Sequence, residues 1–252
     1  IRHAKGFRAG GQNLRAPSPT FFIPFKPETA RSYEIGFKSE FWDRRIRLNA
    51  AAYHTDVTNI QRSSLIGITV DGQVITATVL GNAGKARYRG AEADVTIAVT
   101  PELTLAASAA IVDPKYIKYS DLTGDRRGER FVGVSKSQWA VAADYSKDFG
   151  GAELSLRVDY SWLSKAAFSE YNEPNNPQNA EIIKATTIPA TGLLGARAGV
   201  KFNDGTYKLS VYGRNITNNR SAASGLAVFP LEYAGITRQE PATYGVVGTV
   251  RF

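Results

Sequence analysis

The chain alternates apolar and polar side chains over many short segments, which is the pattern of β-strands. Residues 152–162 show it most clearly, because alanine, leucine, valine, tyrosine and tryptophan take every second position and glutamate, serine, arginine and aspartate lie between them. Successive side chains of a strand point to opposite faces, so this segment has one apolar face and one charged face. The last residues, 243–252, repeat the alternation.

Further segments alternate in the same way, and with the short segment 1–8 they give about ten strands: 33–38, 46–50, 91–97, 103–111, 138–146, 196–202 and 208–211. Some neighbours are joined by short turns that are rich in Gly, Pro, Asp and Asn: 42–45, 100–102, 147–151 and 203–206. Others are joined by long polar stretches: 10–30, 61–85, 115–135, 164–189 and 217–241. The order predicts an all-β meander of antiparallel strands, without helices of useful length and with prolines only in turns, loops and strand ends.

A soluble β-sandwich and a membrane barrel would both alternate in this way. Three features favour the barrel. The strands are about nine to twelve residues long, which suits a tilted membrane strand. Aromatic residues such as Trp42, Trp139 and Trp162 gather near strand ends, and small residues are common on the apolar side. In a hydrocarbon layer every backbone donor must be paired, so such strands are expected in a closed barrel.

Composition excludes several kinds of site. The 252 residues contain no cysteine and only two histidines, His3 and His54, so a disulfide scaffold, a thiolate zinc site and a cysteine nucleophile are excluded. No cofactor or metal site is expected. The net charge of +8 fits either nucleic acid or anionic lipid as a partner and does not decide between them. The chain begins at Ile1 and contains no methionine, so we expect the inside of a longer precursor.

Several motifs are similar to those of one family when they are taken in order along the chain. They are AKGFRAGG at 4–11, PETARSYEIGFK at 27–38, RIRLNAAAY at 45–53 with TNIQ at 58–61, NAGKARYRGAE at 82–92 and RNITN at 214–218. In this order the chain resembles the C-terminal part of the barrel of a TonB-dependent outer-membrane receptor. The resemblance runs from about Lys5 to Phe252.

The resemblance implies about ten C-terminal strands of a larger up-and-down barrel, which in this family has about 22 strands around a plug. Residues 1–252 would then be one barrel portion, without the plug and the TonB box. It also implies the outer membrane of a Gram-negative bacterium, contact with lipid and lipopolysaccharide, and a TonB energising complex reached through the missing plug. The barrel-assembly machinery would recognise the last strand, which contains Tyr244, Val250 and Phe252. Nucleic acid is not expected as a partner.

The long loops carry the candidate ligand-binding residues. Cationic and aromatic side chains gather there: Phe21, Phe22, Phe25, Tyr116, Tyr119, Arg126, Arg127, Arg130, Phe131, Tyr171 and Tyr233. The resemblance implies TonB-dependent import of a scarce nutrient. Arginine and aromatic rings suit an anionic, aromatic metal chelate, so a ferric siderophore is the expected ligand. The basic loops would serve equally well to pair with lipopolysaccharide phosphates, and the Phe21, Phe22 and Phe25 trio would serve equally well as a small hydrophobic cluster.

Enzymatic function is not expected. His54 and Asp56 are the only His–Asp neighbours, they share a strand face, and no second acidic pair or serine elbow accompanies them. Two alternatives to the receptor remain open from the residues alone. One is a self-contained small barrel that acts as a porin or enzyme, and the other is a soluble β-sandwich binding module.

Overall fold

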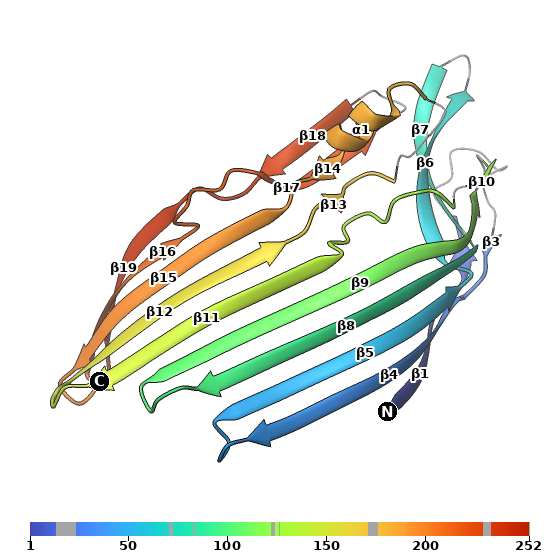
Figure 1. Cartoon of the computed structure of the whole chain (residues 1–252). Coiled ribbons are helices and arrows are strands. Elements are labelled where there is room, and N and C mark those ends of the chain that lie inside the picture. Colours follow the sequence, from blue (N-terminus) through green and yellow to red (C-terminus); the bar gives the residue numbers. More distant parts are fainter. Residues whose placement is uncertain are drawn as a thin grey trace.

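A computed structural model describes residues 1–13, 24–70, 73–82, 84–121, 124–125, 127–170, 176–228 and 233–251. Its main sheet is antiparallel, and ten of its eleven strands follow one another in chain order. They are β1 (Arg2–Arg8), β4 (Glu28–Phe41), β5 (Ile46–Thr58), β8 (Gly84–Ala98), β9 (Leu103–Asp121), β11 (Ser137–Asp148), β12 (Ala152–Leu163), β15 (Thr191–Phe202), β16 (Tyr207–Arg214) and β19 (Thr243–Val250). The strands lie side by side as a curved wall (Figure 1). The predicted meander of about ten strands is confirmed.

The two ends of the wall differ. At one end, called the turn end, strands are joined by the short segments 42–45, 99–102, 149–151 and 203–206. Left-handed backbone closes three of these turns, 42–45, 149–151 and 203–206, for example at Asn203, Asp204 and Gly205. At the other end, called the loop end, long connections extend beyond the sheet (Figure 1). In transmembrane barrels the short turns are periplasmic and the long loops extracellular.

Strand register gathers the apolar side chains on one face of the wall. Leu156 of β12 lies opposite Tyr145 of β11 and Ala198 of β15, and the row continues through Val211 to Val246. Leu156 is 41% exposed and Val246 is 69% exposed. We call this side the apolar face. An apolar surface of this extent requires an apolar medium, which lipid supplies.

The opposite side, called the polar face, is crossed by ion pairs. Arg157 of β12 donates to Asp144 of β11 at 2.7 Å and to Asp159 at 3.3 Å. Nearer the turn end, Lys201 of β15 donates to Glu153 at 3.1 Å. The alternating side chains of 152–162 therefore face two different environments. Strand register places oppositely charged side chains next to one another on one face and apolar side chains next to one another on the other.

Two stretches predicted as loops hold β-hairpins instead. Residues 61–85 contain β6 (Gln61–Val70) paired with β7 (Gln73–Asn82), and residues 217–241 contain β17 (Ala222–Val228) paired with β18 (Tyr233–Arg238). Shorter pairs lie at the same end: β2 (Gly11–Gln12) with β3 (Pro24–Phe25), and β13 (Ala166–Ala167) with β14 (Thr187–Ile188). β10 (Gly124–Asp125) adds to the end of β9.

A short helix and one proline also depart from the sequence-based expectation. Helix α1 (Asn179–Ala185) has seven residues, too few to give a helical period in the sequence. Among the described residues, no helix is long and apolar enough to cross a membrane. Pro114 lies inside β9 rather than past its end. It is tolerated because Val112 donates to Lys136 just before β11, and Pro114 lies beyond that bond, where β9 has no ladder partner on the β11 side.

Candidate ligand site at the loop end of the wall

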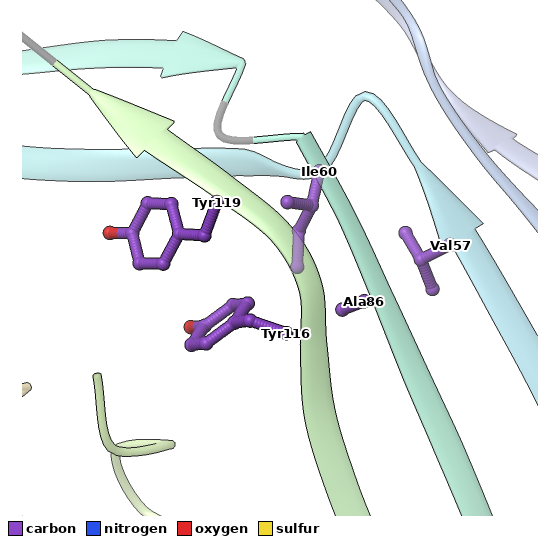
Figure 2. Close-up of a cluster of buried hydrophobic side chains, with 5 residues drawn as sticks. All are labelled: Val57, Ile60, Ala86, Tyr116 and Tyr119. Atoms are coloured by element: carbon purple, nitrogen blue, oxygen red, sulfur yellow. The ribbon is translucent and has the colours of Figure 1, made fainter. Parts of the chain in front are cut away.

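A cluster of buried side chains lies where β5, β8 and β9 reach the loop end. Val57, Ile60, Ala86, Tyr116 and Tyr119 form it, and Figure 2 shows the two tyrosine rings of β9 side by side. Register places Val57, Ala86 and Tyr116 next to one another across the three strands. They therefore share the polar face of the sheet, here covered by the loops. Tyr119 is the most deeply buried large side chain, at 1% exposure.

Aromatic contacts tie a loop to this cluster. Phe131, in the connection between β9 and β11, stacks on Tyr116 with ring centroids 4.1 Å apart. Tyr88 of β8 meets Phe131 edge-on at 5.5 Å, and Tyr116 lies 4.4 Å from Tyr119. Such aromatic pairs contribute about 0.5–1.5 kcal/mol each beyond the area that they bury. Tyr116, Tyr119 and Phe131 were predicted as loop aromatics, and the structure brings them into contact. Tyr88 was missed.

A charged group accompanies the aromatic rings. The guanidinium of Arg62, at the start of β6, lies 6.0 Å from the centroid of Tyr116. Arg62 also forms an ion pair with Glu170, and the Tyr119 hydroxyl donates to the same carboxylate at 3.0 Å. We call Arg62, Tyr88, Tyr116, Tyr119 and Phe131 the aromatic cluster. Arg62 was missed because it belongs to a stretch that the sequence presents only as a polar loop.

Two polar atoms of the aromatic cluster have no hydrogen-bond partner in the described part of the chain: the hydroxyl of Tyr116 and Nε of Arg62. Burying a polar group without a partner costs free energy. The aromatic cluster therefore offers unused hydrogen-bonding groups beside flat rings.

The structure separates the arginines that the sequence grouped. Arg127 pairs with Asp125 at 2.6 Å, and both side chains are more than half exposed. The Arg127 hydrogen bonds lower the pKa of the Asp125 carboxyl, which stays ionised at neutral pH. Arg130 instead donates to the carbonyl oxygens of Ile183 and Thr186 at 3.0 and 2.9 Å. It therefore holds the end of α1, whose last carbonyls need donors.

The remaining candidates that the structure describes are not part of the aromatic cluster. Phe25 of β3 is half-buried and packs over Gly11, where an added Cβ would come within 2.9 Å of its ring. Tyr233 opens β18 opposite Val228. Tyr244 and Val250 of β19 are on the apolar face and are 65% and 48% exposed. Four candidates fall outside the described residues: Phe21, Phe22, Arg126 and Tyr171. Phe252 does so too.

His54 and Asp56 are hydrogen-bonded at 3.0 Å, and arginines contact both of them. Arg87 donates to Asp56 at 2.9 Å, and Arg89 donates to Nδ1 of His54 at 3.3 Å. All four side chains lie on the same side of the sheet as Ile35. Within the described ranges, no group of three His, Cys, Asp or Glu residues is placed to hold a metal ion.

The family is decided by comparison with known sequences. A sequence profile described as TonB dependent receptor-like, beta-barrel, matches residues 2–216. The chain belongs to this family of outer-membrane receptors. The resemblance seen in the sequence motifs is confirmed, and so is the place of the chain in the outer membrane of a Gram-negative bacterium. The family consists of transport receptors, not enzymes.

Two curated relatives share about a quarter of the aligned residues with this chain. The metal-pseudopaline receptor CntO of Pseudomonas aeruginosa is 27% identical over 139 residues, which are 54% of this chain and 18% of the relative. The probable TonB-dependent receptor BfrD of Bordetella pertussis is 25% identical over 191 residues, 74% of this chain and 23% of the relative. The chain thus spans about a fifth of these curated relatives.

A solved structure shares the fold. The ferric yersiniabactin uptake receptor FyuA from Yersinia pestis superposes with a TM-score of 0.75 at 18% identity. The match covers 99% of this chain and 34% of the receptor. The wall of antiparallel strands in Figure 1 therefore corresponds to a part of a receptor barrel.

Proposed function

We propose that the full-length protein is an outer-membrane receptor that imports a scarce metal as an anionic chelate, a ferric siderophore in particular. Family membership over residues 2–216 is the observation that carries the transport class. The relatives support the ligand class, because the names of CntO and FyuA refer to a metal chelate and to a ferric siderophore. The proposal also includes a plug, contributed by a part of the protein outside this chain, through which a TonB complex supplies energy.

The aromatic cluster supports the same ligand class. It lies at the loop end, which is extracellular in such barrels. It combines flat rings, the Arg62 cation and the unused hydroxyl of Tyr116. These are groups that recognise an anionic chelate with aromatic parts. Because Tyr116 and Tyr119 are buried beneath the loops, we propose that the loops must move before a ligand contacts these rings.

Uptake tests the transport class. The full-length receptor is expressed in a strain that lacks its own copy and is offered radioactive iron on catecholate, hydroxamate and carboxylate siderophores, with cobalamin as a neutral ligand. Accumulation of one ferric siderophore that stops when TonB is deleted is the expected result. Flux that persists without TonB would indicate a porin and contradict the proposal. TonB-dependent uptake of cobalamin alone would keep the transport class and contradict the siderophore.

Replacing Arg127 tests whether the ligand is anionic. Its guanidinium is exposed and can exchange Asp125 for an anionic ligand, so Arg127→Gln should weaken binding of the cognate ferric chelate by about fivefold to tenfold. The matched control is Lys147→Gln, which removes one positive charge at the turn end of β11. Titration of the purified full-length receptor is the measurement. If both variants bound the ferric chelate with the same affinity, Arg127 would not contact the ligand.

The last strand is proposed to serve assembly. Tyr244 and Val250 present exposed apolar side chains on β19, the last strand of the sheet, and Phe252 ends the alternating segment in sequence. We propose that the barrel-assembly machinery binds this strand through its alternate apolar side chains. Phe252→Ala in the full-length protein should lower the amount that reaches the outer membrane, measured by surface labelling, while inserted molecules bind ligand normally. Unchanged surface amounts would contradict this role.

A further inference from the structure

A pocket of about 520 Å³ lies on the same side of the sheet as the apolar face, but closer to the loop end. Four of the side chains that line it are cationic: Lys5, Arg31, Lys85 and Arg87. We call it the cationic pocket. Register explains its composition, because Lys5, Arg31, Asp56 and Arg87 are direct neighbours across β1, β4, β5 and β8. These strands lie side by side in Figure 1.

The height of the cationic pocket follows from the strand rise. Along β4, Phe41, Phe37 and Ile35 point to the apolar face, and Arg31 points to the same side four residues beyond Ile35. At about 3.3 Å per residue the pocket lies about 13 Å along the strand past the last large aliphatic side chain. Tyr33 lies between them, as an aromatic residue at a membrane interface does. The pocket is therefore at the headgroup level of the outer leaflet.

The charge of the pocket is not balanced within the wall. Asp56 is the one carboxylate among the lining residues, and Arg87 and His54 already bind it at 2.9 and 3.0 Å. In the described part of the chain, Lys5, Arg31 and Lys85 make no ion pair with a carboxylate. Tyr33, stacked on His3 at 4.8 Å, and Ile117 add apolar surface at the margin.

We propose that the cationic pocket binds the phosphate groups of lipopolysaccharide in the outer leaflet. The lipid that surrounds a barrel on its extracellular side is a phosphorylated glycolipid, and its phosphates lie at the level of the pocket. Lysine and arginine bind phosphate through charge-assisted hydrogen bonds, and Arg31 can do so with two parallel donors. Tyr33 and Ile117 face the first carbons of the acyl chains. This site is on the outer side of the wall, whereas Tyr88, Tyr116 and Tyr119 of the aromatic cluster are on the polar face of the same strands, so the site is independent of the ligand that the receptor imports.

Three probes show whether the pocket binds the phosphate groups of a lipid or free phosphate. Purified full-length receptor in detergent is titrated with bisphosphorylated lipid A, with dephosphorylated lipid A and with inorganic phosphate. The variant is Arg31→Gln with Lys85→Gln. The matched control is Lys38→Gln with Arg47→Gln, which removes the same two charges from the polar face of β4 and β5. A heat-dependent shift in gel mobility shows that each receptor is folded before it is titrated.

Affinity for bisphosphorylated lipid A is expected to fall by about a hundredfold in the variant, about tenfold for each charge removed, and to stay unchanged in the control. Dephosphorylated lipid A should bind the unaltered receptor at least as weakly as bisphosphorylated lipid A binds the variant, because the variant keeps Lys5 and Arg87. Equal affinity of variant and control for lipid A would overturn the proposal. Inorganic phosphate that binds as tightly as lipid A would overturn the choice of a lipid. Chelate uptake by the variant should be normal, so failure of this site and failure of the import function are distinguishable.

Discussion

Replacing Leu156 with arginine is expected to destabilise the folded barrel in lipid by roughly 2–4 kcal/mol. The reason is the position of Leu156 in the middle of β12 and on the apolar face, between Tyr145 and Ala198. An arginine there must place its charge in hydrocarbon or extend it to the interface, and both alternatives are costly at the midplane.

The neighbouring residue gives the control. Ser155 points to the polar face, where its hydroxyl donates to the carbonyl of Gly199 at 3.2 Å, and Arg157 and Asp144 show that charge is accepted on that side. Ser155→Arg should therefore be tolerated. Urea titration of the refolded full-length barrel in lipid vesicles measures both variants. Equal losses at 155 and 156 would mean that the two faces are wrongly assigned.

Replacing Arg130 with glutamine is expected to loosen the loop end without unfolding the wall. Arg130 donates to Ile183, Thr186 and Thr187, all at the end of α1 or just after it, and hydrogen bonds from a charged donor contribute about 1.5–3 kcal/mol. The opening free energy of residues 179–188 should fall by about 2–3 kcal/mol, so their amides should exchange roughly 30- to 150-fold faster.

Hydrogen exchange followed by mass spectrometry of the full-length receptor measures this effect. Arg127→Gln is the control, because Arg127 contacts only its near neighbour Asp125 and should leave exchange at 179–188 unchanged. Protection of 179–188 that is the same in the Arg130 variant would show that Arg130 is not the residue that holds α1. Its side chain would then be free for the ligand role that the sequence assigned to it.

The strands of the wall could be predicted from the sequence because each strand has its own alternation of apolar and polar residues. A membrane strand has one face in lipid and one in a polar lumen, so a segment such as 152–162 alternates over its whole length. The turns could be read as well, because a tight reversal such as 203–206 requires left-handed backbone and therefore Asn, Asp or Gly. These signals are local, and the antiparallel meander needs nothing else.

The loop end could not be predicted in the same way. The hairpin of β6 and β7 projects away from the sheet, so its polar and β-branched residues do not alternate against a lipid face. Asp71-Gly72, a dipeptide typical of hairpin turns, was the one local signal for it. Helix α1 is too short for a helical period, and it depends on Arg130, which is about fifty residues away in the chain.

The candidate site shows the same limit. Tyr116 and Phe131 were recognised as loop aromatics, but their stacking depends on a chain reversal that composition does not reveal. Arg62 joins them because β6 starts beside β9, and an isolated arginine in a polar stretch gives no sign of that contact. The cationic pocket could not be predicted from the sequence for a related reason. Its four cations come from three strands, β1, β4 and β8, and only the strand register makes them neighbours.

β12 and its neighbours have one face in lipid and the other in the lumen, and the mobility and accessibility of single side chains along β12 test this directly. Because residues 1–252 contain no cysteine, single cysteines can be placed one at a time from residue 152 to residue 163 and spin-labelled in the full-length receptor in lipid vesicles. Collision with oxygen, which concentrates in hydrocarbon, is then compared with collision with a water-soluble nickel chelate. We expect the oxygen collision rate to alternate with a period of two residues, with maxima at Leu154, Leu156 and Val158 and minima between them. A profile without that period, or with maxima at Ser155 and Arg157, would contradict it.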